Sequence, residues 1–201
     1  MDARQLPLAQ PTQPERADAT RNRALLLSTA RALLEQNGVD NLTMDGLARA
    51  AGLGKGTVFR RFGSRTGLLL ELINEIETEF QRRFLSGPPP LGPGAAPIER
   101  LVAFGRERIA ILAVQGDLLR AADEGPDARF VSPPRAAGQL HISILLRQAG
   151  FDGDVDVQSF NLIATLDAAL VLYENRGEQI EMRRVADGWE DLVRRVARPR
   201  S

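Results

Sequence analysis

Apolar residues recur along most of this chain at steps of three and four, which is the spacing of one face of an α-helix. In the first part of the chain the pattern predicts four helices, over residues 18–37, 44–51, 55–62 and 65–85. Gly38 and Gly52 follow the first two as helix stops, and Thr43 and Ser64 precede the second and fourth as N-caps. The early part of the chain is therefore predicted to be a cluster of short helices that leads into a long one.

A proline-rich stretch separates this cluster from the rest. Residues 86–97 hold five prolines and three glycines, a composition that excludes a helix or a central strand. Helical periodicity then returns over residues 98–115, 117–123, 134–149, 155–175 and 178–197. No alternating, strand-like run stands out, so the prediction is an all-α fold of nine helices. We expect a flexible tail at 1–17, an N-terminal domain at 18–80 and a second domain at 81–201.

The composition is that of a globular chain and removes several kinds of chemistry. The 201 residues are 43% hydrophobic and 26% charged, with no cysteine and one histidine. Disulfides, thiolate catalysis and cysteine- or histidine-rich metal sites are excluded, and no cofactor, metal or enzymatic activity is expected. The first 17 residues lack the apolar core of a signal peptide and no stretch is apolar enough to cross a membrane, so a cytoplasmic protein is expected.

The charge is divided between the two parts of the chain. Residues 1–66 carry ten basic and six acidic side chains, whereas residues 67–201 carry sixteen basic and twenty acidic ones. A basic first part suggests contact with an anionic partner. A difference of this size also arises by chance, so it supports the interpretation only together with a motif.

That motif lies between Leu42 and Arg61. A capped helix, a glycine-containing turn and a basic helix are the components of a helix-turn-helix. Val58 and Phe62 would face inward, leaving an open side that holds Lys55, Thr57, Phe59, Arg60 and Arg61. Such a helix fits the major groove of DNA, where arginine pairs with guanine and basic side chains neutralise phosphates.

Residues 21–72 resemble the DNA-binding domain of the TetR family of bacterial repressors. The matching positions are Ala30, Leu34, Gly38, Leu42-Thr43-Met44, Leu47-Ala48, Ala51-Gly52-Leu53, Gly56 to Phe62, Ser64-Arg65 and Leu68-Leu69. Three positions depart from the family pattern: Gly54 replaces a common serine, Phe59 the usual tyrosine and Arg65 a common lysine. The residues expected at the DNA are Thr43, Lys55, Gly56, Thr57, Phe59, Arg60, Arg61 and Arg65.

Other interpretations of the same segment are weaker. Gly52 to Thr57 superficially resembles a phosphate-binding loop, but Arg49 and Gly56 stand where that motif needs glycine and serine or threonine. The helix before it also replaces the strand that the motif requires. A small helical packing unit without DNA binding remains the alternative.

The last helix carries a narrow apolar seam that suits a dimer interface. TetR-like proteins dimerise through their last two helices, and the preceding helix here is apolar on nearly all sides. The residues expected at the interface are Val171, Met182, Val185, Trp189, Leu192 and Val196. An ordinary protomer core would produce the same stripe.

The resemblance also implies a chamber for a small, mostly apolar effector within the second domain. Its candidate residues are Phe104, Arg108, Ile111, Leu119, His141, Leu145, Asn161 and Asp167. The function expected is a homodimeric repressor that binds an inverted repeat in double-stranded DNA and leaves it when an unidentified effector binds. The alternatives are an activator, a regulator without an effector, or a helical carrier or enzyme.

Overall fold

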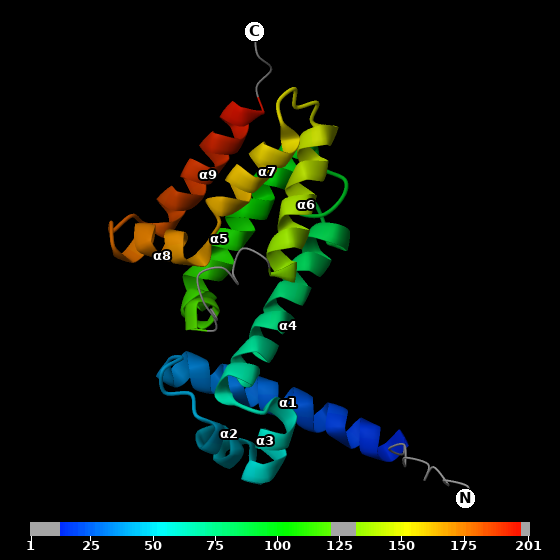
Figure 1. Cartoon of the computed structure of the whole chain (residues 1–201), viewed down its shortest axis with the longest axis vertical. Coiled ribbons are helices and arrows are strands. Elements are labelled where there is room, and N and C mark those ends of the chain that lie inside the picture. Colours follow the sequence, from blue (N-terminus) through cyan, green and yellow to red (C-terminus); the bar gives the residue numbers. More distant parts are fainter. Residues whose placement is uncertain (1–12, 122–131, 198–201) are drawn as a thin grey trace, which may run out of the picture. The chain divides into compact units, whose positions relative to one another are not determined.

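The computed structural model describes residues 13–121 and 132–197, and every regular element within these ranges is an α-helix (Figure 1). This confirms the all-α prediction. The helices of the described ranges are α1 (Gln13–Asn37), α2 (Met44–Ala51), α3 (Lys55–Phe62), α4 (Arg65–Ser86), α5 (Pro97–Ala121), α6 (Pro133–Gln148), α7 (Val155–Ala164), α8 (Ala168–Arg176) and α9 (Met182–Val196).

The chain forms two compact units that divide between Leu68 and Leu69, inside α4. The expected division lay further along, at residues 80 and 81, with the proline-rich stretch as its natural landmark. That stretch instead belongs to the second unit, where Leu91 is buried in the core. Helix α1 begins at Gln13, ahead of the expected Asp18, and residues 1–12 of the expected tail lie outside the described part.

The first unit has a small core of its own. Its fully buried side chains come from α1, α2 and α3 and from the start of α4, among them Leu26, Ala30, Leu47, Val58 and Leu68. Apolar residues at helical spacing therefore meet at the centre of this unit, as their periodicity predicted.

The second unit is built around α5, which packs against α6, α8 and α9, while α6 and α7 pack on each other (Figure 1). Three phenylalanines at its centre, Phe80, Phe84 and Phe104, have ring centroids 5.0 to 5.3 Å apart. Two of these contacts are edge-to-face, an arrangement that aromatic quadrupoles favour.

Two of the expected helices have different bounds. Helix α5 continues through Gly116, where a break was expected. Glycine suits this position, because a β-carbon on residue 116 would lie 2.8 Å from Cδ2 of Leu172. The single helix expected over 155–175 is divided into α7 and α8. Asp167 caps α8, its Oδ1 accepting hydrogen bonds from the backbone N–H groups of Ala169 and Leu170.

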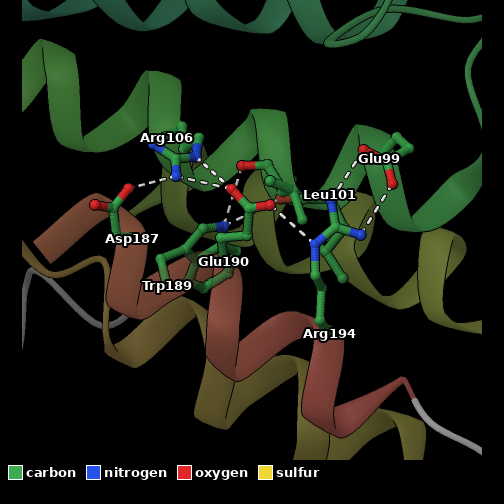
Figure 2. Close-up of polar contacts among 8 residues, drawn as sticks. Glu99, Leu101, Arg106, Asp187, Trp189, Glu190 and Arg194 are labelled. Carbon is green, nitrogen blue, oxygen red and sulfur yellow. Dashed lines mark hydrogen bonds and ion pairs between the residues drawn. The ribbon is translucent and has the colours of Figure 1, made fainter. Parts of the chain in front are cut away.

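Trp189, which was expected at a dimer seam, is buried within its own protomer. Its side chain is 3% exposed within the protomer, and its indole Nε1–H donates to the backbone carbonyls of Leu101 and Val102 on α5 (Figure 2). The periodic stripe of α9 faces α5 of the same chain. An apolar stripe shows that a helix face is covered, but it does not show by which chain.

Ion pairs flank this contact between α5 and α9. Arg106 bridges Asp187 and Glu190 at 2.6 and 2.7 Å, and Arg194 joins Glu190 to Glu99 (Figure 2). These side chains are partly exposed, so each pair contributes little by itself, and their arrangement as a network orients α9 on α5.

Among the described helices, none is by itself long and apolar enough to cross a membrane. Helices α7 and α8 reach that length and composition only as a pair, which is bent by 46°.

Candidate nucleic-acid interface and ligand cavity

Helices α2 and α3 form a helix-turn-helix with well-defined ends. Thr43 caps α2, its Oγ1 accepting a hydrogen bond of 3.0 Å from the N–H of Gly46. Gly52 ends the helix at φ 66°, a left-handed conformation that glycine adopts without the strain a side chain brings. Leu53 then donates to the carbonyl of Ala48, and Gly54 begins α3 in an extended conformation.

Helix α3 presents a polar, basic face outward. Val58 and Phe62, one turn apart, are buried and fix the helix to its unit. Arg60 and Arg61 are exposed, and the Phe59 ring is 46% exposed beside them. Thr57 is half-buried, and Lys55 and Gly56 are exposed in the first turn. The structure thus gathers on one helix the residues that were expected on its open side.

The first turn of α3 adds backbone donors to this face. No side chain caps the helix at Gly54, and the first N–H groups of any α-helix lack an intrahelical acceptor. Together with the helix dipole they favour an anion. Lys55 projects from the same turn, where its Nζ lies 2.5 Å from Oδ2 of Asp45 in a solvent-exposed ion pair.

Arg65 has a structural role that the sequence analysis did not foresee. Its Nε–H donates to the carbonyl of Leu42 at 2.8 Å, and its Nη2–H donates to that of Val39 at 2.5 Å. The guanidinium is half-buried and ties the loop between α1 and α2 to the start of α4. An arginine fork can hold two carbonyls at once, so Arg65 has a structural role beside the expected phosphate contact.

The second unit contains a cavity of about 600 Å³. Four of the residues expected at an effector line it: Phe104, Arg108, Leu119 and Asp167. The other four do not. Leu145 is fully buried in the core, Ile111 packs against that core, Asn161 is exposed and His141 is buried behind the aromatic side chains.

His141 is enclosed by aromatic rings. Its ring centroid lies 4.4 Å from that of Phe84 and 5.3 Å from that of Phe104, and its Nε2 makes no hydrogen bond. Burial, with a smaller contribution from the positive charge of Arg100, lowers the pKa of His141 to about 4. The imidazole is therefore neutral in the folded protein at pH 7.

The sequence analysis missed one of the cavity's two acidic side chains, Glu77, and the guanidinium groups of Arg120 and Arg135. Glu77 on α4 is 5% exposed and forms an ion pair of 2.6 Å with Arg108 on α5. Arg135 on α6 is half-buried, and desolvation lowers the pKa of its guanidinium. The helical periodicity of the sequence predicts that Glu77 and Arg135 lie on the surface. Only the folded structure shows that they line the ligand cavity.

Most of the residues expected at the dimer interface are buried in their own protomer or pack against its core. Val171 is fully buried, and Met182, Val185 and Val196 pack against the core of the second unit. Only Leu192, which is 36% exposed, remains on the surface. The large apolar side chains on the outside of the neighbouring helices α6 and α7 are Leu140, Ile144, Val157 and Phe160.

Comparison with known proteins agrees with this architecture. Residues 26–72 match the family model for bacterial regulatory proteins of the tetR family. The HTH-type transcriptional regulator SAB2452 of Staphylococcus aureus is 32% identical over 69 residues, which are 34% of this chain and 37% of that protein. The chain thus spans about a third of the length of the curated relatives it matches, which are HTH-type transcriptional regulators.

Solved structures extend the likeness over nearly the whole chain. A TetR-family transcriptional regulator from Pectobacterium atrosepticum has a TM-score of 0.70 at 22% identity, covering 92% of this chain and 99% of its own. AibR in complex with isovaleryl coenzyme A and operator DNA has a TM-score of 0.57 at 21% identity, covering 86% and 97%. Residues 26–72 therefore resemble the N-terminal domain of the tetR family, and the chain has the all-helical fold of solved TetR-family regulators.

Proposed function

We propose that this protein is a homodimeric transcriptional repressor that binds an inverted-repeat operator and leaves it when a small molecule fills the cavity of the second unit. The observation that carries the proposal is the outward face of α3. Its inner side chains, Val58 and Phe62, are buried, while Phe59, Arg60 and Arg61 lie exposed on a helix held by a helix-turn-helix. That combination is how a recognition helix enters the major groove.

The roles of the residues follow from their chemistry. Arg60 and Arg61 supply charge for phosphates or paired donors for guanine, and Phe59 supplies an apolar surface without the hydroxyl of a tyrosine. The first-turn amides of α3 and the Lys55 ammonium receive a backbone phosphate, with Lys55 exchanging Asp45 for it. Thr43 and Thr57 contribute hydroxyl donors at the edges of this face.

The dimer forms through α6 and α7 in this proposal. These helices pack on each other, and each leaves large apolar side chains exposed: Leu140 and Ile144 on α6, Val157 and Phe160 on α7. Several exposed apolar groups on adjoining helices favour a protein contact. A second copy of the chain would bring a second α3 to the DNA, as an inverted repeat requires.

In this proposal, a small molecule that binds in the cavity causes the repressor to release DNA. Ligand binding releases DNA only if the ligand binds the released form more tightly than the DNA-bound form. Helix α4 offers a route, since its first residues belong to the N-terminal unit and its later ones, including Glu77, line the cavity. AibR, crystallised with both an acyl coenzyme A and operator DNA, is a fold relative for which both partners are seen.

DNA binding is tested by fluorescence anisotropy on labelled duplex DNA at several salt concentrations. The double variant Arg60→Ala/Arg61→Ala should lose contacts to phosphates or to guanine, which lowers affinity, and each lost phosphate contact makes the dependence on salt shallower. The matched control is Arg82→Ala, which removes an exposed, paired arginine from α4 in the second unit. Equal affinities for the double variant and the wild-type protein would contradict the proposal.

A further inference from the structure

A buried ion pair lies in the wall of the cavity in the second unit. Glu77 Oε1 accepts a hydrogen bond of 2.6 Å from Nη1 of Arg108, and the two side chains are only 6% and 18% exposed. Removing two charges from water is costly, and the pair recovers that cost only in part. Because this pair lies in the wall of a cavity, we expect a ligand to bind one of its two side chains.

The guanidinium is the member better suited to that use. Arg108 reaches across the ring of Phe80, with Cζ 5.9 Å from the ring centroid, and its bond to Glu77 occupies only one of its several N–H donors. Its planar fork can hold a second carboxylate with two parallel hydrogen bonds. The Glu77 carboxylate is the more deeply buried group and already faces a cation.

The other ionic side chains of the cavity favour an anion as well. Arg135 brings a second guanidinium to the wall from α6, and Arg120 of α5 brings a third. The carboxylate of Asp167 is engaged at the start of α8, where its Oδ1 accepts from two backbone N–H groups. A cation entering the cavity would meet the three guanidinium groups, whereas an anion would find them as partners.

The remainder of the wall suits an apolar body. Phe80, Phe84 and Phe104 line the cavity together with Ile163 and Leu166. The cavity's volume of about 600 Å³ is within the range of small-molecule sites. Apolar surfaces with a few fixed polar groups bind ligands that have one charged end and a hydrocarbon or aromatic remainder.

We propose that the effector is an apolar-bodied carboxylic acid whose carboxylate binds Arg108 in competition with Glu77. This inference rests on the proposed function, since it names the ligand class of the same cavity. It also supplies a mechanism for the response. When the ligand takes Arg108, the tie between α4 and α5 made by Glu77 is lost, and α4 is the helix that continues from the N-terminal unit.

The test uses isothermal titration calorimetry on the full-length protein without DNA. The probes are octanoate, decanoate and 4-phenylbutanoate, each compared with the primary amide and the amine of the same carbon skeleton. At least one carboxylate should bind about tenfold more tightly than its amide or amine, the difference that one charge-assisted contact produces. Tighter binding of the amines, equal binding of all three forms, or no binding by any carboxylate would overturn the ligand class.

Two variants separate ligand contact from a structural role of the pair. Arg108→Gln should weaken carboxylate binding about tenfold, whereas Glu77→Gln should strengthen it, because the competing carboxylate is gone. Arg106→Gln on the same helix, whose partners Asp187 and Glu190 lie outside the cavity, should leave binding unchanged. A purely structural pair would lose ligand affinity in both Arg108→Gln and Glu77→Gln, and that result would overturn the proposal.

The failure of this ligand class can be distinguished from the failure of the proposed function. Circular dichroism establishes that each variant is folded, and the comparison of probes on the wild-type protein needs no variant at all. DNA affinity is measured separately on the same preparations. A protein that binds DNA but no carboxylate retains the proposed function without this ligand class, whereas one that binds carboxylates but no DNA refutes the regulator and leaves the cavity's chemistry in place.

Discussion

A β-carbon on Gly105 would overlap the indole ring of Trp189, so the backbone of α5 approaches this ring more closely than any other residue type would allow. The contact also brings the Trp189 Nε1–H within 3.2 Å of the carbonyls of Leu101 and Val102 (Figure 2). Because residue 105 has no side chain, the Trp189 ring can pack closely on α5 and its buried indole N–H can reach an acceptor.

Gly105→Ala should lower the free energy of unfolding by about 1–3 kcal/mol, the usual cost of overpacking a core. Gly188→Ala on α9 is the matched control, because its β-carbon would meet open space and alanine favours a helix by up to about 1 kcal/mol over glycine. Urea denaturation followed by Trp189 fluorescence measures both. Equal effects of the two substitutions would contradict the packing described for α5 and α9.

The dimer surface is tested with charges on its proposed face. Leu140→Glu/Phe160→Glu should convert a dimer into a monomer, since burying two unpaired carboxylates is costly. Val114→Glu, on an exposed position of α5, should leave the dimer intact. Sedimentation velocity distinguishes these outcomes, and a dimeric double variant would move the interface away from α6 and α7.

His141 makes stability depend on pH. Its folded pKa of about 4 lies below the ordinary value of 6.5, so the unfolded chain binds the proton more tightly. The contribution is complete above about pH 6.5 and is lost as the pH falls towards 4, by about 3 kcal/mol in all. Free energies of unfolding at pH 7 and pH 4.5 should therefore differ less in His141→Phe than in the wild-type protein. An unchanged difference would show that other groups cause the acid dependence.

The sequence predicted the N-terminal unit well because its signals are local. The Thr43 cap, the Gly52 stop and the spacing of Val58 and Phe62 act over a few residues, and the structure has each as expected. Predictions failed where a distant segment decides the outcome. Gly116 lies within α5 with Leu172 packed against it, and Trp189 is covered by α5 of its own chain.

The lining of the ligand cavity could be predicted from the sequence only in part. Phe104 and Arg108 could be selected from periodicity, but Glu77 and Arg135 come from other helices, and only the fold brings them to the same cavity. His141 was selected for its chemistry, yet it packs against Phe84 and Phe104, which line the cavity, and is not itself part of the lining. Residue type indicates what a side chain can do, and the packing of distant helices decides whether it can reach a ligand.

Arg65 and Arg61 should differ in how their loss affects DNA binding. Arg61→Ala should weaken binding to all sequences and reduce the salt slope by about one, as expected for a lost phosphate contact. Arg65→Ala removes the ties to Val39 and Leu42, so it should lower the melting temperature of the N-terminal unit while leaving the salt slope of the folded protein unchanged. A reduced slope with unchanged stability in Arg65→Ala would return this residue to the DNA interface.

The most direct test of the regulator itself is selection of bound sequences from random duplex DNA with the full-length protein. Two copies of α3 related by a two-fold axis should enrich an inverted repeat whose half-site centres lie about 34–36 Å apart or slightly more. The Arg60→Ala/Arg61→Ala protein, run in parallel, should enrich no sequence. Enrichment of an inverted repeat by the wild-type protein alone is the result that the account predicts. No enrichment, enrichment of direct repeats only, or the same sequences recovered with the double variant would contradict it.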